Sequence, residues 1–420
     1  MVKRIILSVL LLLSAAHLWA QLPRSREFHD KYHLTEVVVF SRHNIRAPLS
    51  APGSFISKVT PYTWHDFGVK TGELTMKGGV LETINGQFFH KWAVSENLFP
   101  ENAEPADEEL YVLANSFQRT IATARYFSAG FMPMKTVTVH HESEPDHMDA
   151  NFSPIPGRDI TGAEWEQIKA EYKAAYSDED IRKISETLRP AYDLLSEIID
   201  MKNSEAYRSG SFTGFNNYNS TVVFRGEDEP RMSASLDEAA SVVDALLLQY
   251  YEEPDSQKAA FGKKISIEDW RMLAGIIDTC MEIRFGSPFI QSYVSRRLRE
   301  YIADALQKDG RKFTFICGHD VNIFNILRVL RTVKYETTDA VEHGSPIGSK
   351  IVFEKWTDAA GNHFVAVNHV YQTVDQLRNV TPLDLDTRPA IIPLQFEGLE
   401  PNADGLYPFD RMIQRLVGAS

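Results

Sequence analysis

Three short apolar runs along the chain predict buried β-strands. They lie at Val37–Phe40, Tyr111–Ala114 and Phe313–Cys317, and β-branched or aromatic side chains dominate them. Each is followed by polar residues and, further on, by apolar residues at helical spacing, which is clearest in Thr75–Asn97. Alternation of strands and helices is typical of an α/β fold. We therefore expect a parallel-rich sheet flanked by helices.

The middle of the chain has a different pattern, which is mostly helical from Thr161 to about Tyr251. The only strand candidate there is Val222–Phe224. Capping-box spacing marks three helix starts, at Thr161 with Glu164, Ser177 with Asp180, and Ser235 with Glu238. We expect residues 151–254 to form an inserted α-helical cap domain, and residues 21–150 and 255–420 to form one α/β core domain.

Two later segments alternate apolar and polar residues as strands do. They are Lys350–Trp356 and Phe364–Tyr371, and Asp358–Asn362 separates them. This pattern predicts a hairpin, which we place at the edge of the sheet.

The first 20 residues have the features of a secretory signal peptide. Lys3 and Arg4 precede the apolar run Ile5–Leu13, and the segment that follows, Ser14–Ala20, has small residues at Ala16 and Ala20. The run is too short to span a membrane. We expect cleavage after Ala20, or alternatively after Ala16, and a periplasmic or secreted protein with no membrane association after cleavage.

The net charge narrows the range of partners. It is −13 for the whole chain and −15 once Lys3 and Arg4 are removed. An acidic protein is poorly suited to nucleic acid or to an anionic membrane. A phosphate substrate stays possible, because a local basic pocket acts at short range. The chain has only Cys280 and Cys317, and we expect two separate buried thiols rather than a disulfide.

Charged residues follow all three predicted core strands. The first strand is followed by Ser41-Arg42-His43-Asn44-Ile45-Arg46-Ala47-Pro48, the second by a helix with Arg119 in its first turn, and the third by Gly318-His319-Asp320. Ligands of parallel α/β sheets bind at the carboxyl ends of the strands. We therefore expect these arginines, histidines and the aspartate to share one crevice.

This set of side chains suits hydrolysis of a phosphomonoester. Arginines match the geometry of phosphate oxygens. Neighbouring cations would lower the pKa of His43 and leave a neutral imidazole that could attack phosphorus. Asp320 could protonate the leaving alcohol and later activate water. Because Asp320 must first be protonated, we expect an acidic pH optimum; His319 would be a further donor to phosphate.

Two motifs resemble a known family. Arg42–Pro48 resembles the Arg-His-Gly-x-Arg-x-Pro signature of the histidine acid phosphatases, and Gly318-His319-Asp320 resembles their second signature. Asn44 replaces the glycine of the first signature, as in the glucose-1-phosphatase branch of that family. Other stretches similar to that branch are Leu74–Leu81, Ala114–Thr123, Gln249–Glu252, Pro346–Phe353, Tyr371–Asn379 and Asp404-Gly405.

The resemblance implies an exported acid phosphatase that needs no metal or other cofactor and acts on small sugar phosphates such as glucose 1-phosphate. It implies that His43 is the nucleophile and Asp320 the proton donor. The phosphate pocket would consist of Arg42, Arg46, Arg119 and His319. Glu229 would contact the sugar, although Glu227 and Asp228 are close competitors.

Alternatives remain open at this point. An inositol-phosphate (phytate) phosphatase of the same family is the second hypothesis, and a non-catalytic phosphosugar-binding protein is a third. A cluster of metal-type ligands suggests a metal-dependent hydrolase instead: His140, His141, Glu142, Glu144, Asp146, His147 and Asp149. Its irregular spacing favours a solvated loop. The sequence leaves the oligomeric state and the role of Asn44 undetermined.

Overall fold

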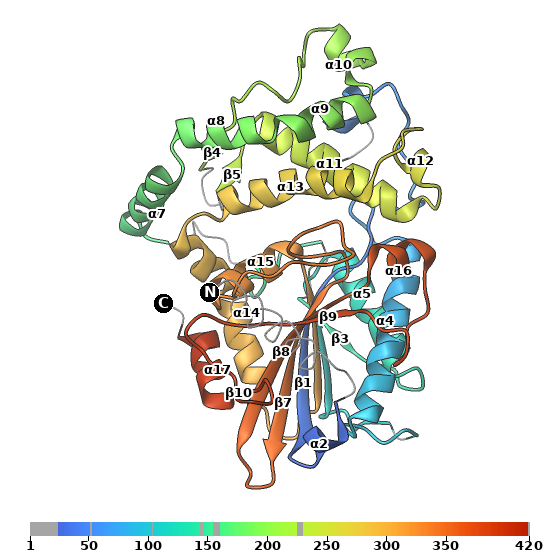
Figure 1. Ribbon diagram of the computed structural model, residues 1–420, viewed down its shortest axis with the longest axis vertical. Helices are drawn as coiled ribbons and strands as arrows, with labels where there is room; N and C mark the ends of the chain where they lie inside the picture. The colour runs from blue at the N-terminus through green and yellow to red at the C-terminus, as the bar shows by residue number, and fades with distance from the viewer. Residues whose placement is uncertain are drawn as a thin grey trace, which may run out of the picture.

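The computed structural model describes residues 24–50, 53–102, 104–142, 144, 146–153, 160–224 and 230–418. The predicted signal peptide, together with Glu227, Asp228 and Glu229, lies outside the described residues. A sheet flanked by helices forms one part of the molecule, and a layer of helices lies across one end of it (Figure 1).

The sheet is mixed, with a parallel half and an antiparallel half. Its order is β10-β8-β7-β1-β6-β2-β3, and β9 also pairs with β8. The parallel strands are β1 (Tyr32–Arg42), β6 (Phe313–Gly318), β2 (Leu110–Ala114) and β3 (Val139–His140). The antiparallel strands are β7 (Lys350–Asp358), β8 (His363–Tyr371), β9 (Ala390–Pro393) and β10 (Tyr407–Pro408).

The predicted hairpin is β7 and β8, but its expected place at the sheet edge is wrong. β7 pairs with β1 over most of its length, so it lies inside the sheet. Its side chains explain why, because all but two of its nine residues are buried. A strand that is buried on both faces is typical of the interior of a sheet rather than of its edge.

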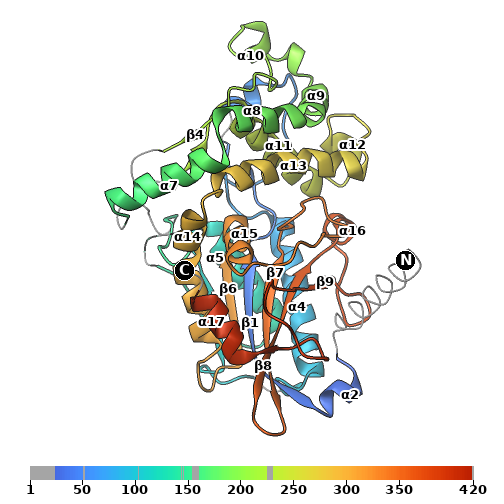
Figure 2. The same cartoon turned by 60° about the vertical axis from the view of Figure 1, so that its left-hand side comes forward.

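Helices cover both faces of the sheet (Figure 2). Val37 and Val39 of β1 face α4 (Met76–Ser95) and α5 (Gln118–Phe131), whereas Val38 and Phe40 face the other side. The helices on that side are α14 (Pro288–Ala305), α15 (Asp320–Val329) and α17 (Phe409–Val417). Short helices α2 (Arg26–His29), α3 (Phe55–Lys58) and α16 (Val374–Asn379) lie in the connections.

The helical cap has a main core that is distinct from the two cores of the sheet, although this core also takes in Ile45, Leu81 and Ile347 of the α/β part. Its elements are α7 (Gly162–Ala175), α8 (Asp178–Thr187), α9 (Arg189–Ile198), η1 (Met201–Asn203), α10 (Glu205–Arg208), β4 (Val222–Val223), β5 (Arg231–Met232), α11 (Ser235–Glu252), α12 (Ser256–Ala259) and α13 (Ile267–Arg284). Trp270 and Leu273 of α13 share this core with Leu246 of α11. The helical layer therefore continues past residue 254 as far as Arg284.

Two of the three predicted capping boxes are confirmed, and the third is wrong. Thr161 and Ser177 each cap a helix with the expected reciprocal partner. At the third, Ala234 is the N-cap residue, and the Ser235 hydroxyl donates to the Asn219 side chain at 3.0 Å instead. Both cysteines are free, with Cys317 buried and Cys280 half-buried. Within the described chain, no helix is long and apolar enough to cross a membrane.

Candidate active site

The carboxyl ends of β1, β6 and β2 lie side by side and position the predicted site. Arg42 is level with Gly318, and Ala114 is level with Cys317. The structure brings together all six side chains predicted for this crevice, namely Arg42, His43, Arg46, Arg119, His319 and Asp320. The ring centroids of His43 and His319 are 5.5 Å apart. An Arg119 nitrogen lies 3.5 Å from His319 Nδ1, and Arg42 pairs with Asp320 at 3.1 Å.

The arginines retain unused hydrogen-bond donors. Within the described parts of the chain, the Nε atoms of Arg42, Arg46 and Arg119 are buried and have no hydrogen-bond partner. Buried polar groups are normally partnered in native proteins. Unpartnered guanidinium donors that converge on one pocket indicate a site for an oxyanion.

His43 is buried and orientated for attack through Nε2. Its Nδ1 lies 2.8 Å from the backbone oxygen of Asn44. A carbonyl oxygen only accepts, so Nδ1 carries the proton and Nε2 keeps its lone pair. Burial, followed by the charges of Arg119 and other nearby groups, holds the pKa of His43 well below its ordinary value of 6.5. The imidazole is therefore neutral near pH 7.

Asp320 is ionised in the free protein. It is the first residue of α15, and its Oδ1 accepts from the Val321 backbone at 2.8 Å. Burial alone would raise its pKa, but the charges of Arg42 and Arg46 outweigh burial and lower it. The mechanism expected from the sequence needs a protonated Asp320 in its first step. This protonation requires another negative charge nearby, such as a bound phosphate, to offset the charges of the arginines.

Two further carboxylates contact the site arginines. Glu342 lies 3.6 Å from Arg42 and accepts from the Tyr251 hydroxyl at 2.6 Å. Asp244 of α11 meets one nitrogen of Arg46 through both of its oxygens at 3.1 Å. Sequence reasoning missed both acids, because neither follows a strand. Tyr251, which donates to Glu342, belongs to the stretch Gln249–Glu252. The similarity of that stretch to the glucose-1-phosphatase branch was a sequence signal for this part of the site.

Asn44 belongs to a buried polar network behind His43. Its side chain donates to Glu82 of α4 at 2.9 Å, and Glu82 pairs with Lys350 of β7 at 2.9 Å. Gly348 has a φ of +68°, and a Cβ there would approach the Asn44 amide nitrogen to 2.6 Å. The Asn44 side chain therefore points into the fold and fastens the loop that carries His43.

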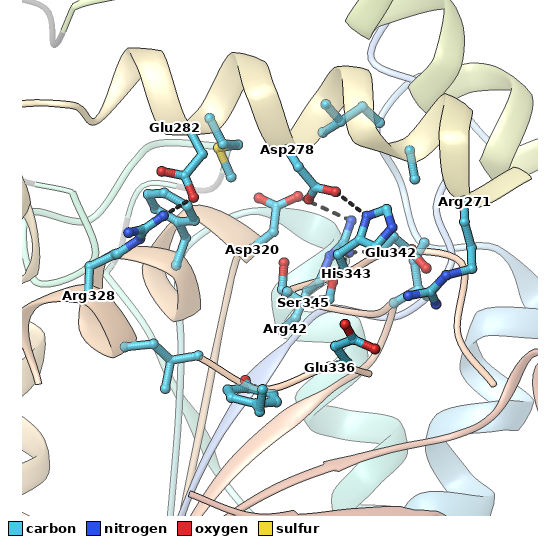
Figure 3. Close-up of a pocket in the computed structure, with 18 of the residues that line it drawn as sticks. Arg42, Arg271, Asp278, Glu282, Asp320, Arg328, Glu336, Glu342, His343 and Ser345 are labelled. Atoms are coloured by element: carbon cyan, nitrogen blue, oxygen red, sulfur yellow. Dashed lines mark hydrogen bonds and ion pairs between the residues drawn. The ribbon is translucent and has the colours of Figure 1, made fainter. Parts of the chain in front are cut away.

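A cleft of about 730 Å³ opens beyond Arg42 and Asp320, between the cap and the core (Figure 3). Two ion pairs connect its sides, Asp278 with His343 at 2.6 Å and Glu282 with Arg328. Acidic side chains are numerous in its lining, which includes Asp244, Asp278, Glu282, Asp320, Glu336 and Glu342. Arg42 and Asp320 line the cleft and His43 does not, so the cleft lies on the Asp320 side of the site, where a leaving group would sit.

The structure assigns a packing role to parts of the predicted metal-type cluster. The His140 ring stacks on Tyr111 with centroids 4.4 Å apart, and the Asp149 backbone donates to Asn115. Among the described residues, no three His, Cys, Asp or Glu side chains are placed to hold a metal ion.

An α/β sheet with a cationic pocket at its strand ends, and a buried histidine in that pocket, is typical of an enzyme that acts on phosphate groups. The chain belongs to the histidine phosphatase superfamily (branch 2), whose family model matches residues 33–371. It is therefore a phosphoric monoester hydrolase of the histidine acid phosphatase type.

Named relatives and solved structures agree with this family. The chain is 32% identical over 386 residues to a glucose-1-phosphatase of Salmonella typhimurium, with 91% of each chain covered. It is 33% identical over 378 residues to a glucose-1-phosphatase of Providencia rettgeri, covering 89% of this chain and 88% of the relative. The apo phytase of Hafnia alvei has a similar structure, with a TM-score of 0.83, 25% identity, and coverage of 93% and 97% of the two chains.

Proposed function

We propose that the protein is an exported acid phosphatase that hydrolyses small sugar phosphates, such as glucose 1-phosphate, through a phosphohistidine. The observation that carries the proposal is the neutral, buried His43, whose Nε2 is free beside three arginines with unused donors. A nucleophile, an oxyanion site and an acid are thus within one pocket.

In the first step, His43 Nε2 attacks phosphorus while Arg42, Arg46, Arg119 and His319 bind the phosphoryl oxygens. The N–P bond forms as the P–O bond to the alcohol breaks. Asp320 gives its proton to the departing alcohol oxygen. The bound phosphate supplies the negative charge that allows Asp320 to hold this proton.

In the second step, water attacks the phosphohistidine. Asp320, now ionised, takes a proton from the water as the new O–P bond forms and the N–P bond breaks. Inorganic phosphate leaves, and His43 returns to its neutral state with Asp320 protonated. Splitting hydrolysis in this way replaces one difficult displacement with two easier ones.

The charges of the cleft support a leaving group with hydroxyls rather than further phosphates. Arg328 is paired with Glu282, and Arg271 donates to the backbone oxygens of Thr337 and Ala340. Lys334 is a further cation of the lining, but the acidic side chains outnumber the arginines and the lysine there and can accept hydrogen bonds from sugar hydroxyls. The roles of Glu229 and of its competitors Glu227 and Asp228 stay predictions.

A phytate phosphatase is the second candidate. A phytase of Escherichia coli is 26% identical over 396 residues. The similar Hafnia alvei enzyme has also been solved with myo-inositol hexakis sulphate, and the cleft volume here is ample for a substituted ring. The cleft charges favour the sugar phosphate over this candidate.

The test is phosphate release by purified protein without the first 20 residues, at about pH 4 to 7, which brackets carboxyl and histidine titration. Glucose 1-phosphate and phytate are compared with EDTA present, beside a His43→Ala variant. Faster release from glucose 1-phosphate supports the proposal, and faster release from phytate selects the second candidate. Activity that persists in His43→Ala contradicts the phosphohistidine.

Export is tested separately. The full-length chain is expressed in a Gram-negative host, and the mass of the protein in the periplasmic fraction is measured. We expect loss of the residues up to Ala20, or up to Ala16, as the sequence pattern predicts. An uncleaved chain in the cytoplasm would contradict export and would leave the proposed chemistry unaffected.

A further inference from the structure

Asn115, at the end of β2, is fully buried beneath His319. Its Oδ1 accepts from the backbone N–H of Ser116 at 2.8 Å and from that of Asp149 at 3.0 Å. Two backbone donors at one end of an amide identify that end as the oxygen. The other end, Nδ2, is therefore the end that faces His319.

Asn115 Nδ2 lies 2.7 Å from His319 Nε2 and 2.9 Å from the sulfur of Met148. An amide nitrogen donates and does not accept. His319 Nε2 must then be the unprotonated nitrogen of the ring, and the proton must be on Nδ1. Burial and the charge of Arg119 lower the pKa of His319 to about 3, so the ring is neutral.

The other side of the His319 ring faces the phosphate pocket. Nδ1 lies 3.5 Å from an Arg119 nitrogen. If Nδ1 carries the proton, both atoms are donors and cannot bond to each other. Both can instead donate to one acceptor that lies between them, and a phosphoryl oxygen of the substrate is such an acceptor.

We propose that Asn115 is a positioning residue that holds His319 in its Nδ1–H tautomer and thereby makes it a hydrogen-bond donor to the substrate phosphate. The hydrogen bond from His319 to phosphate rests on the proposed function, whereas the assignment of the Nδ1–H tautomer does not depend on it. The acidic segment near Asp149 participates through its backbone N–H, which donates to Asn115.

Asn115→Asp is the decisive substitution because it preserves shape and both backbone contacts. One aspartate oxygen can accept from Ser116 and Asp149, while the other faces Nε2 and now attracts a proton. We expect the proton to move to Nε2 and the pKa of His319 to rise. The matched control is Ser116→Ala, which removes a buried hydroxyl at the same strand end that has no hydrogen-bond partner among the described residues.

The first measurement is ¹⁵N NMR of histidine-labelled protein, with the His319 signals assigned by their loss in His319→Gln. In the wild type and in Ser116→Ala, we expect a protonated Nδ1 and an unprotonated Nε2. In Asn115→Asp, we expect a protonated Nε2 and an unprotonated Nδ1 at neutral pH, and a ring with both nitrogens protonated at lower pH. An unprotonated Nδ1 in the wild type would overturn the proposal.

The second measurement is the pH profile of phosphate release. At neutral pH, Asn115→Asp loses the Nδ1–H donor, so kcat/KM should fall about 10- to 100-fold, the worth of a charge-assisted hydrogen bond. As the pH falls through the raised pKa of His319, the imidazolium regains that donor, and kcat/KM relative to wild type should recover. A fall without recovery, or no fall, contradicts the proposal.

The two measurements separate the possible failures. If the wild type releases no phosphate, the proposed function fails, and the NMR result still decides whether Asn115 sets the tautomer. If the wild type is active and the NMR signals of Asn115→Asp match those of the wild type, the positioning role fails alone.

Discussion

The two ends of the active site are built in opposite ways. At the phosphate end, the functional side chains come from adjacent strand ends, and Arg42, His43, Arg46 and His319 are nearly fully buried. At the leaving-group end, helices of the cap and loops of the core face each other across a cleft with many acids and half-exposed ion pairs. On the proposed function, the core would bind the phosphate, and the cleft between cap and core would select the ester.

The largest effect should follow from removing the nucleophile at the phosphate end. His43→Ala cannot form the phosphohistidine, so kcat should fall on the order of 10⁴-fold or more, as expected when covalent catalysis is lost. Phosphate release from glucose 1-phosphate measures it, with circular dichroism as the control for folding. A fall of less than about tenfold in the folded variant would show that His43 does not attack phosphorus.

The next effect should distinguish the two ends by the chemistry of the leaving group. Asp320→Asn cannot protonate an alcohol, so kcat/KM for glucose 1-phosphate, which reports the first step alone, should fall about 10²- to 10⁴-fold. p-Nitrophenyl phosphate should lose far less, because its phenolate leaves without a proton. Equal losses for both esters would mean that Asp320 serves phosphate binding instead.

Asp320 also predicts a pH dependence. In the free protein, the arginines lower its pKa despite burial, and in the complex the phosphate charge opposes them. A step that needs protonated Asp320 slows as the pH rises through that pKa. The alkaline limb of kcat, which reports the complex, should therefore lie at a higher pH than the Asp320 limb of kcat/KM, and Asp320→Asn should abolish it.

A stability effect should follow from breaking the buried network behind His43. Lys350→Met leaves Glu82 charged and unpaired in the core, which should cost about 3–5 kcal/mol. Lys183→Met is the matched control, because its pair with Glu179 is exposed to solvent and should contribute little to stability. Urea unfolding measures both, and similar losses would contradict the importance of this network.

The smallest effects should come from the leaving-group end. Asp278→Asn weakens a half-exposed pair with His343, so the free energy of unfolding should change by about 1 kcal/mol or less. The KM for glucose 1-phosphate should rise a few-fold while inhibition by inorganic phosphate stays constant. A matching change in phosphate inhibition would mean that the two ends are not separable.

The phosphate end could be predicted from the sequence because its residues directly follow strands. The run before Arg42 and the run before His319 are mostly apolar, so the position of each charged residue relative to the sheet follows from local pattern alone. The core strands and the helix after Thr75 were predictable for the same reason, within two residues at each end except at the start of β1, which begins at Tyr32 rather than Val37.

The leaving-group end could not be predicted, because its partners meet only in the folded chain. Asp244 reaches Arg46 from a cap helix, and Glu342 reaches Arg42 from an irregular loop. The misplaced hairpin has a similar cause, since alternation along β7 and β8 predicts pairing between them but not that β7 also pairs with β1. The predicted capping box at Ser235 is wrong because the Ser235 hydroxyl donates to the side chain of Asn219, which is distant in sequence.

One turn of α11 connects the cap to the core through four consecutive residues. Gln249 accepts from the backbone of His65 at 2.8 Å, and the Tyr250 ring lies 4.1 Å from the guanidinium carbon of Arg378. Tyr251 donates to Glu342, and Glu252 accepts from Thr75 at 3.0 Å. A chimera that receives the cap of a related phosphatase must therefore inherit these four core partners as well, so the two domains are exchangeable only as a matched set.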